Sequence, residues 1–236
     1  MATMHNLESR DHWIAVAKDN DVPQLALLAS KLSTGARGQL LASIEECLVH
    51  PEIRAHEHTR VPLAKLLIAM VPDSWAAIRT FIIDRGATRL DGEVRFSLFC
   101  FLDDLPRLSA APALISEAAH LVGDYLRHAE SNTASATWMA GDLLGAHWDP
   151  REAVPILIDV LTNGRYAEGR LAALHGLEHA IGNADCSGAL GQSIIRVISK
   201  VASDDRSRRV RESAQRVRNG VSVCGQPGIA KYAPDV

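Results

Sequence analysis

The sequence is poor in aromatic residues, in paired cysteines and in net charge. Phe, Trp and Tyr make up only 5% of the 236 residues, so a core has to be built from aliphatic side chains. The four cysteines include no Cys-x-x-Cys pair, which removes the usual signature of a zinc ribbon or a redox dithiol. A formal net charge of −3 provides no overall attraction to nucleic acid or to an anionic membrane.

Several functional motifs and targeting signals are also missing. The sequence has no Gly-rich phosphate loop, no Gly-x-Ser-x-Gly elbow and no heptad repeat. The N-terminus lacks the apolar core of a secretory signal. The best apolar run, residues 61–71, is interrupted by Lys65 and is too short to span a bilayer. We therefore expect a cytoplasmic protein without membrane partners, and we expect no cofactor.

The residues that are abundant favour helices. Leu, Ala, Ile and Val supply most of the 47% hydrophobic content and recur at steps of three and four residues, and no alternating strand pattern is found. The fold class is therefore predicted to be all-α. Gly86, Gly164 and Gly220 follow predicted helix ends and are expected in the left-handed conformation. Besides the helices of the repeat described next, the expected helical segments are 12–32, 36–49, 74–85, 112–127, 152–161 and 192–202.

A helical pattern recurs along the chain. Small or apolar residues mark the middle of alternate helices, at Ala64, Leu98, Ala140, Ala173 and Ala214. An arginine stands three residues before three of these positions, as Arg95, Arg170 and Arg211. The spacing is irregular but lies in the range of two-helix repeats. The pattern therefore predicts successive helix pairs rather than a single bundle.

Three runs carry a family resemblance: Ala140-x-x-Leu-Leu-Gly145, Asp149-Pro-Arg-Glu-Ala-Val-Pro155 and Arg170-x-x-Ala-x-x-Gly-Leu177. They resemble the HEAT-repeat superfamily, most closely the short HEAT-like repeats of phycobilin lyase subunits, over about a third of the chain. The resemblance implies a right-handed α-α superhelix, a solenoid of about five to six helix pairs over residues 1–220, with a C-terminal tail at 221–236. It also implies a scaffold that binds a macromolecule.

Charged side chains on the second helix of each pair are the predicted binding residues. Glu117, His120 and Asp124 share one face of segment 112–127, opposite its apolar stripe. If the pairs stack, such residues form a ladder on a concave surface to which another protein would bind. The simpler explanation is that every amphipathic helix has a solvated face. The full set is Arg79, Glu117, His120, Asp124, Arg127, Asp159, Arg196 and Lys200.

A different chemistry is suggested by His175-Gly-Leu-Glu178-His179. This string matches the His-x-x-Glu-His motif of inverted zinc peptidases, in which two histidines bind zinc and the glutamate is the general base. A further acidic ligand would have to come from Glu212 or Asp142. Because the string lies inside the repeat signature, the leading interpretation contains no metal and no catalytic residue. A metal-binding protein that uses His175, Glu178 and His179 is an alternative.

Another alternative comes from Trp138 and Asp142, which lie one helical turn apart. HEAT-like alkylpurine DNA glycosylases use a Trp and an Asp to hold a damaged nucleotide, and they also need a basic groove. The basic cluster of this chain is Arg206, Arg208, Arg209, Arg211, Arg216 and Arg218, which a charged capping repeat would also explain. A DNA-binding protein or glycosylase is thus the alternative to a non-catalytic, protein-binding scaffold.

Overall fold

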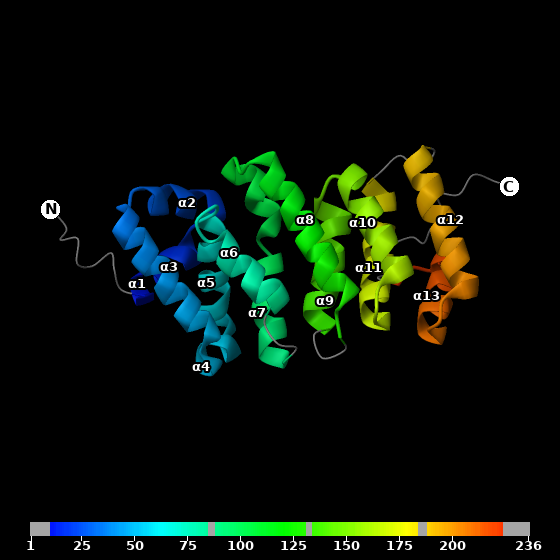
Figure 1. Ribbon diagram of the computed structural model, residues 1–236, viewed down its shortest axis with the longest axis horizontal. Coiled ribbons are helices and arrows are strands. Elements are labelled where there is room, and N and C mark those ends of the chain that lie inside the picture. Colours follow the sequence, from blue (N-terminus) through cyan, green and yellow to red (C-terminus); the bar gives the residue numbers. More distant parts are fainter. Residues whose placement is uncertain (1–9, 85–87, 131–133, 184–187, 224–236) are drawn as a thin grey trace. The chain divides into compact units, whose positions relative to one another are not determined.

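The computed structural model describes residues 10–84, 88–130, 134–183 and 188–223 (Figure 1). Within these ranges the chain is all-helical, as the sequence predicts, with thirteen α helices and no β strand. None of the helices in these ranges combines the length and apolar content that a membrane crossing requires. The chain folds as two units, residues 1–115 and 116–236, and each is described separately.

The first unit is built around one buried helix, α5, which contacts α1, α2, α3, α4 and α7. Leu63, Leu66 and Leu67 of α5 are almost completely excluded from solvent, so this helix supplies much of the core. The α helices of the unit are α1 (Arg10–Asp19), α2 (Val22–Ser30), α3 (Thr34–Val49), α4 (Pro51–Ala55), α5 (Glu57–Ala69), α6 (Trp75–Arg79) and α7 (Arg89–Phe99). A π-helical turn, η2 (Thr80–Asp84), follows α6, and a 3-10 helix, η3 (Leu102–Leu108), follows α7.

The prediction of one continuous helix over residues 12–32 is wrong, because α1 ends at Asp19 and α2 begins at Val22. The Asp21 side chain accepts a hydrogen bond from the backbone N–H of Gln24 at 2.9 Å, which caps the start of α2. Pro23 occupies the first turn of α2, where its missing N–H is not needed. This start signal, Asp21 followed by Pro23, separates α2 from α1.

Lys65, which interrupts the apolar run, has a structural role. Its ammonium donates hydrogen bonds to the carbonyl oxygens of Ala17 at 2.9 Å and Asn20 at 2.8 Å. These carbonyls lie at the C-terminal end of α1, where helical acceptors lack partners and a cation is favourable. Lys65 therefore ties α5 to α1. It also lines a groove of about 620 Å³ in this unit, together with His58 and Phe101.

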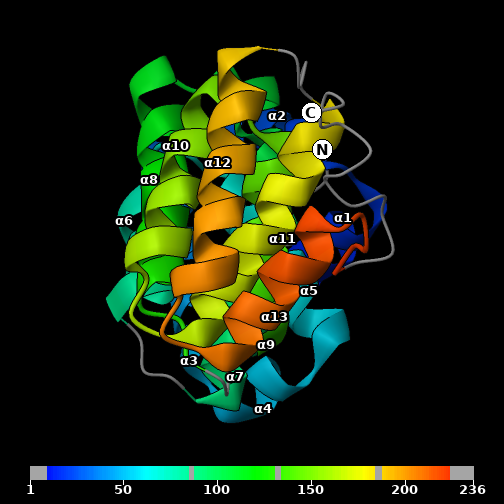
Figure 2. The same ribbon diagram turned by 90° about the vertical axis from the view of Figure 1, so that its right-hand side faces the viewer.

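The second unit has two layers of helices (Figure 2). One contains α8, α10 and α12, and the other contains α9, α11 and α13, with α10 packed on α11 and α12 on α13. The helices are α8 (Pro112–Arg127, whose first four residues belong to the first unit), α9 (Ala134–Asp142), α10 (Pro150–Asn163), α11 (Ala167–Asn183), α12 (Ala189–Asp204) and α13 (Arg208–Arg218). A π-helical turn, η5 (Leu143–His147), continues α9. The predicted helix at 112–127 is confirmed.

Glycines bring α9 and η5 unusually close to α11. A Cβ atom added at Gly141 would lie 2.2 Å from the carbonyl oxygen of Ala172, and one added at Gly145 would lie 2.0 Å from that of Gly176. No side chain fits at either position, so the two backbones can touch only because these residues are glycine. From the first contact to the second, both segments advance by four residues, from Gly141 to Gly145 and from Ala172 to Gly176. The two segments therefore run parallel. This contact places Asp142 beside α11.

The recurring arginines share one role, which is to bind the turn that precedes their own helix. Arg95 and Arg170 are buried, and each of the three donates to a backbone carbonyl. The acceptors are those of Ile82 for Arg95 (2.9 Å), Gly164 for Arg170 (2.8 Å) and Asp205 for Arg211 (2.5 Å). The sequence repeat therefore corresponds to a repeated local interaction.

Of the three glycines predicted to be left-handed, Gly86 lies outside the described residues, and the other two differ in outcome. Gly220 has φ 83°, so that prediction is confirmed. Gly164 has φ −54° and ψ 134°, so its predicted left-handed conformation is wrong. Its carbonyl instead accepts hydrogen bonds from Arg170 and Arg206, which hold the turn in an extended conformation.

Candidate metal centre

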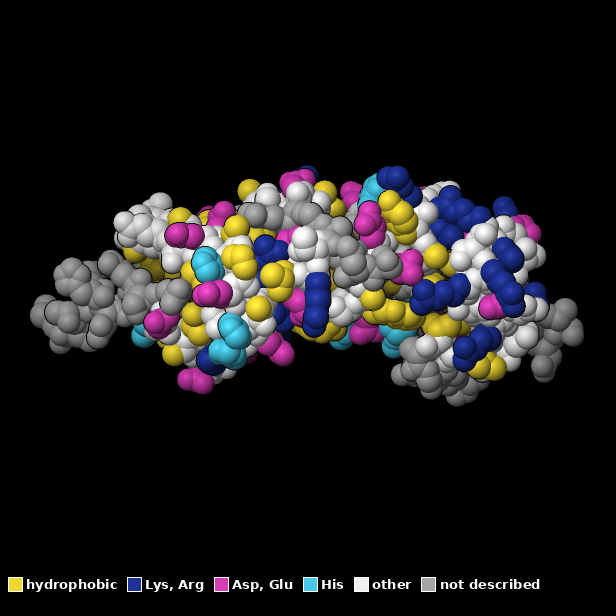
Figure 3. Space-filling view, turned by 90° about the horizontal axis from the view of Figure 1, so that it is seen from below, with side chains coloured by type: hydrophobic (Ala, Val, Ile, Leu, Met, Phe, Trp, Pro, Cys, Tyr) yellow, Lys and Arg dark blue, Asp and Glu magenta, His cyan; other side chains and the backbone are white. Residues whose placement is uncertain are grey.

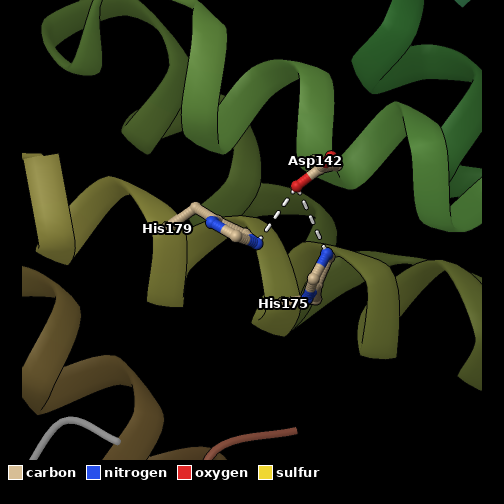
Figure 4. Close-up of side chains that lie close together, drawn as sticks. All are labelled: Asp142, His175 and His179. Atoms are coloured by element: carbon tan, nitrogen blue, oxygen red, sulfur yellow. Dashed lines mark ion pairs between the residues drawn. The ribbon is translucent and has the colours of Figure 1, made fainter. Parts of the chain in front are cut away.

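Three potential metal ligands meet where η5 begins, between α9 and α11. Asp142 is the last residue of α9, at the point where the helix changes to the π-helical turn. His175 and His179 stand one turn apart on α11, so they lie on the same face. Figure 4 shows the three side chains pointing toward one another from the two segments. Single π-helical turns inside α helices often occur at functional sites.

The distances between the ligand atoms suit a small metal ion. Oδ1 of Asp142 lies 3.0 Å from Nε2 of His179 and 3.5 Å from Nε2 of His175. One ligand atom from each residue lies within 4.8 Å of the other two. A tetrahedral ion bound at about 2.0–2.1 Å separates its ligand atoms by about 3.4 Å. The two carboxylate–imidazole distances bracket that value.

Aromatic contacts hold His175 in position. Its ring centroid lies 4.6 Å from that of Trp138 on α9 and 4.6 Å from that of His179, both in edge-to-face geometry. Its Nδ1 atom is buried and has no hydrogen-bond partner among the described residues. A buried polar atom in that state costs about 1–3 kcal/mol.

The environment keeps His175 uncharged. Burial, and then the neighbouring His179, lower the pKa of His175 from 6.5 to about 4, and Asp142 only partly opposes the shift. At pH 7 the ring is therefore neutral, which is the form in which imidazole binds a metal. The His175 ring therefore has no positive charge to lose before it can bind a metal ion.

Glu178, the predicted general base, does not belong to this cluster. Its Oε2 accepts hydrogen bonds from the Ser222 hydroxyl at 3.2 Å and from the Val223 N–H at 3.1 Å. The carboxylate thus holds the segment that follows α13 against α11. Glu212, the other acidic candidate, pairs with Arg208 at 2.6 Å. The potential ligand atoms that lie close together are therefore those of Asp142, His175 and His179, without Glu178.

The predicted protein-binding residues lie on helix surfaces, but some neutralise one another. Glu117, His120 and Asp124 are exposed on α8, and the half-buried Arg127 pairs with Asp124 and with Asp159 of α10. Asn163 also donates to Asp159 at 2.8 Å, and the hydrogen bonds from Asn163 and Arg127 lower the pKa of Asp159. Arg196 and Lys200 are exposed on α12, whereas Arg79 is exposed on α6 of the first unit. That these residues form a ladder on one concave surface remains a prediction.

Lys and Arg side chains gather at the right of Figure 3, where Figure 1 places α12 and α13. Much of this charge is engaged within the unit. Arg208 pairs with Glu212, and Arg209 pairs with Glu168 at 3.0 Å beside a cavity of about 180 Å³ that Trp138 also lines. Arg206 and Arg211 donate to backbone carbonyls. These contacts leave fewer cations for phosphate groups than the sequence indicates.

Sequence reasoning found the histidine pair and named Asp142 as one of two possible acidic ligands, the other being Glu212. The signal that favours Asp142 is the four-residue spacing of Gly141 and Gly145, together with Gly176, because such glycines mark backbones in contact. Asp142 adjoins the first of them. Its carboxylate therefore had to lie near the face of α11 that carries the two histidines.

The cluster offers two imidazole nitrogens and one carboxylate oxygen. This ligand set suits Zn²⁺ and its neighbours among the divalent transition metals. No protein-family model, curated protein or solved structure matches the chain. The function has to be inferred from this geometry.

Proposed function

We propose that the second unit binds one divalent transition-metal ion, Zn²⁺ in the first instance, through Asp142, His175 and His179. The supporting observation is the convergence of three ligand atoms from two helical segments within 4.8 Å. Two spacings are close to those of a tetrahedral ion, and His175 is neutral at pH 7.

Such an ion would join α9 to α11. Both histidines lie on α11, whereas Asp142 ends α9, so no single helix holds all three ligands. An ion that binds only the folded arrangement adds its binding free energy to the stability of the unit. At a metal concentration 100 times Kd this gain is about 2.7 kcal/mol.

Removing one ligand tests the proposal. We expect metal-free protein without an affinity tag to bind one Zn²⁺ per chain in a calorimetric titration, with a higher Tm when zinc is present. His179→Ala should weaken binding by about 100-fold or more, which exceeds the 10–100-fold cost of losing an outer hydrogen-bond partner. Asp142→Ala should have a similar effect. Neither the Asp142 nor the His179 side chain is fully buried.

The matched control is His120→Ala, which removes an exposed histidine from α8 in the same unit. This variant should bind zinc as the unmodified protein does. If His179→Ala retains the original affinity, or if His120→Ala loses as much, zinc binds to surface histidines and the proposed site is wrong.

We also propose that the unit is a HEAT-like solenoid scaffold that binds another protein. The layer of α8, α10 and α12 and the layer of α9, α11 and α13 support a repeat. Exposed Glu117, His120 and Asp124 supply a charged surface on α8. The mechanism is shape and charge complementarity on rigid helices, where little side-chain entropy is lost on binding.

Capture from the native host tests this second proposal. The unmodified chain should retain a defined protein partner, and Asp124→Arg should lose it because the charge on the exposed face of α8 is reversed. Equal capture by the variant would show that α8 is not the interface. Recovery of nucleic acid in place of a protein would favour the DNA-binding alternative.

A further inference from the structure

The proposed metal centre has fewer protein ligands than a closed zinc site. Among the described residues, the group that could hold an ion consists of Asp142, His175 and His179. Structural zinc sites have four protein ligands, whereas catalytic zinc sites have three and keep the fourth position for water or substrate. Within the described part of the chain, the cluster matches the second type.

Exposure of the three side chains indicates from which side a further ligand can enter. Asp142 is 35% exposed and His179 is 21% exposed, whereas His175 is only 10% exposed. Trp138 covers His175, with ring centroids 4.6 Å apart. Solvent therefore reaches the cluster past Asp142 and His179, and an incoming ligand has to approach from that side.

The charge of the loaded site favours an anion at that position. A divalent ion carries two positive charges, Asp142 contributes one negative charge, and neutral imidazoles contribute none, which leaves one net positive charge. An ion is often the largest local charge in its surroundings, and a partly buried site screens it less than bulk water does. Oxygen of a carboxylate or phosphate group is an acceptable ligand for Zn²⁺ and its neighbours.

We infer that the fourth position of the ion held by Asp142, His175 and His179 is exchangeable and takes an oxyanion, a carboxylate or phosphate group, in place of water. This inference rests on the proposed metal function. The centre would then be a ligand-binding site rather than only a link between two helices.

The experiment uses full-length protein loaded with Co²⁺, whose visible absorption reports on its own coordination. Acetate and inorganic phosphate are added separately, and bound cobalt is measured after each titration. We expect a saturable change in the visible bands while cobalt stays bound, with acetate or phosphate identifying the preferred oxyanion. His128→Ala should give the same change, because its side chain is exposed just after α8.

The failures of the two proposals can be distinguished. Cobalt that binds, but whose bands do not respond to either anion, would overturn the exchangeable position and leave the metal site standing. An intense thiolate-to-cobalt band would do the same, because it would show a cysteine in the fourth position. Failure of cobalt and zinc to bind would overturn both proposals.

Discussion

Replacing Gly145 with alanine is expected to destabilise the second unit by about 3 kcal/mol or more, toward the upper end of overpacking effects. The new Cβ atom would lie 2.0 Å from the carbonyl oxygen of Gly176 and 2.6 Å from its Cα. These are backbone atoms, so no side-chain rotation can relieve the overlap, and η5 has to move away from α11. Because Asp142 directly precedes η5, the same movement should weaken zinc binding.

Thermal unfolding monitored by circular dichroism measures the effect, with an expected fall in Tm of about 10 °C or more. The control is Gly38→Ala in α3, where an added Cβ meets nothing within 4 Å. Because Gly38 is exposed within a helix, its replacement by alanine should raise the free energy of unfolding by about 0.5–1 kcal/mol. Equal stability of Gly145→Ala and the unmodified protein would mean that η5 and α11 are not in backbone contact.

Removing the buried Arg170 side chain is expected to cause the second large loss of stability. Arg170 is 2% exposed, and its Nε and Nη2 atoms bind the two carboxylate oxygens of Asp205 at 2.8 and 3.0 Å. Arg170→Met would leave the Asp205 carboxylate, which is only 6% exposed, without its cation. Breaking a buried ion pair in this way costs about 3–5 kcal/mol.

Chemical denaturation of a double variant distinguishes the cost of the unpaired buried charge from the cost of lost packing. Arg170→Met with Asp205→Asn should be more than about 1 kcal/mol more stable than Arg170→Met alone, because no buried charge remains. Arg151→Met, which removes an exposed ion pair with Asp149, should leave the free energy of unfolding nearly unchanged. A double variant no more stable than the single one would assign the loss to packing.

Local signals explain where the sequence predicted the fold well. The boundaries of α8 were predicted because apolar side chains recur on one face of residues 112–127 and the segment starts with Pro112. The cap formed by Asp149 before α10 is likewise local, since its side chain accepts a hydrogen bond from the Arg151 N–H at 2.9 Å. The break between α1 and α2 was missed although it too carries a local signal, Asp21 followed by Pro23.

The site was harder to predict, because it depends on packing between segments. His175 and His179 were recognisable from their spacing on one helix, but Glu178 follows the same local pattern and faces Ser222 and Val223 instead. The contacts of Gly141 with Ala172 and of Gly145 with Gly176 bring Asp142 to the histidines. A local motif does not contain that information, although the glycine spacing does.

The most direct test of the metal centre is an X-ray anomalous difference map, measured at the zinc edge from crystals grown with Zn²⁺. The proposed site predicts one strong peak at about 2.0–2.2 Å from Oδ1 of Asp142 and from Nε2 of both His175 and His179. A map with no peak between α9 and α11, or with zinc only on surface histidines such as His120, would contradict it.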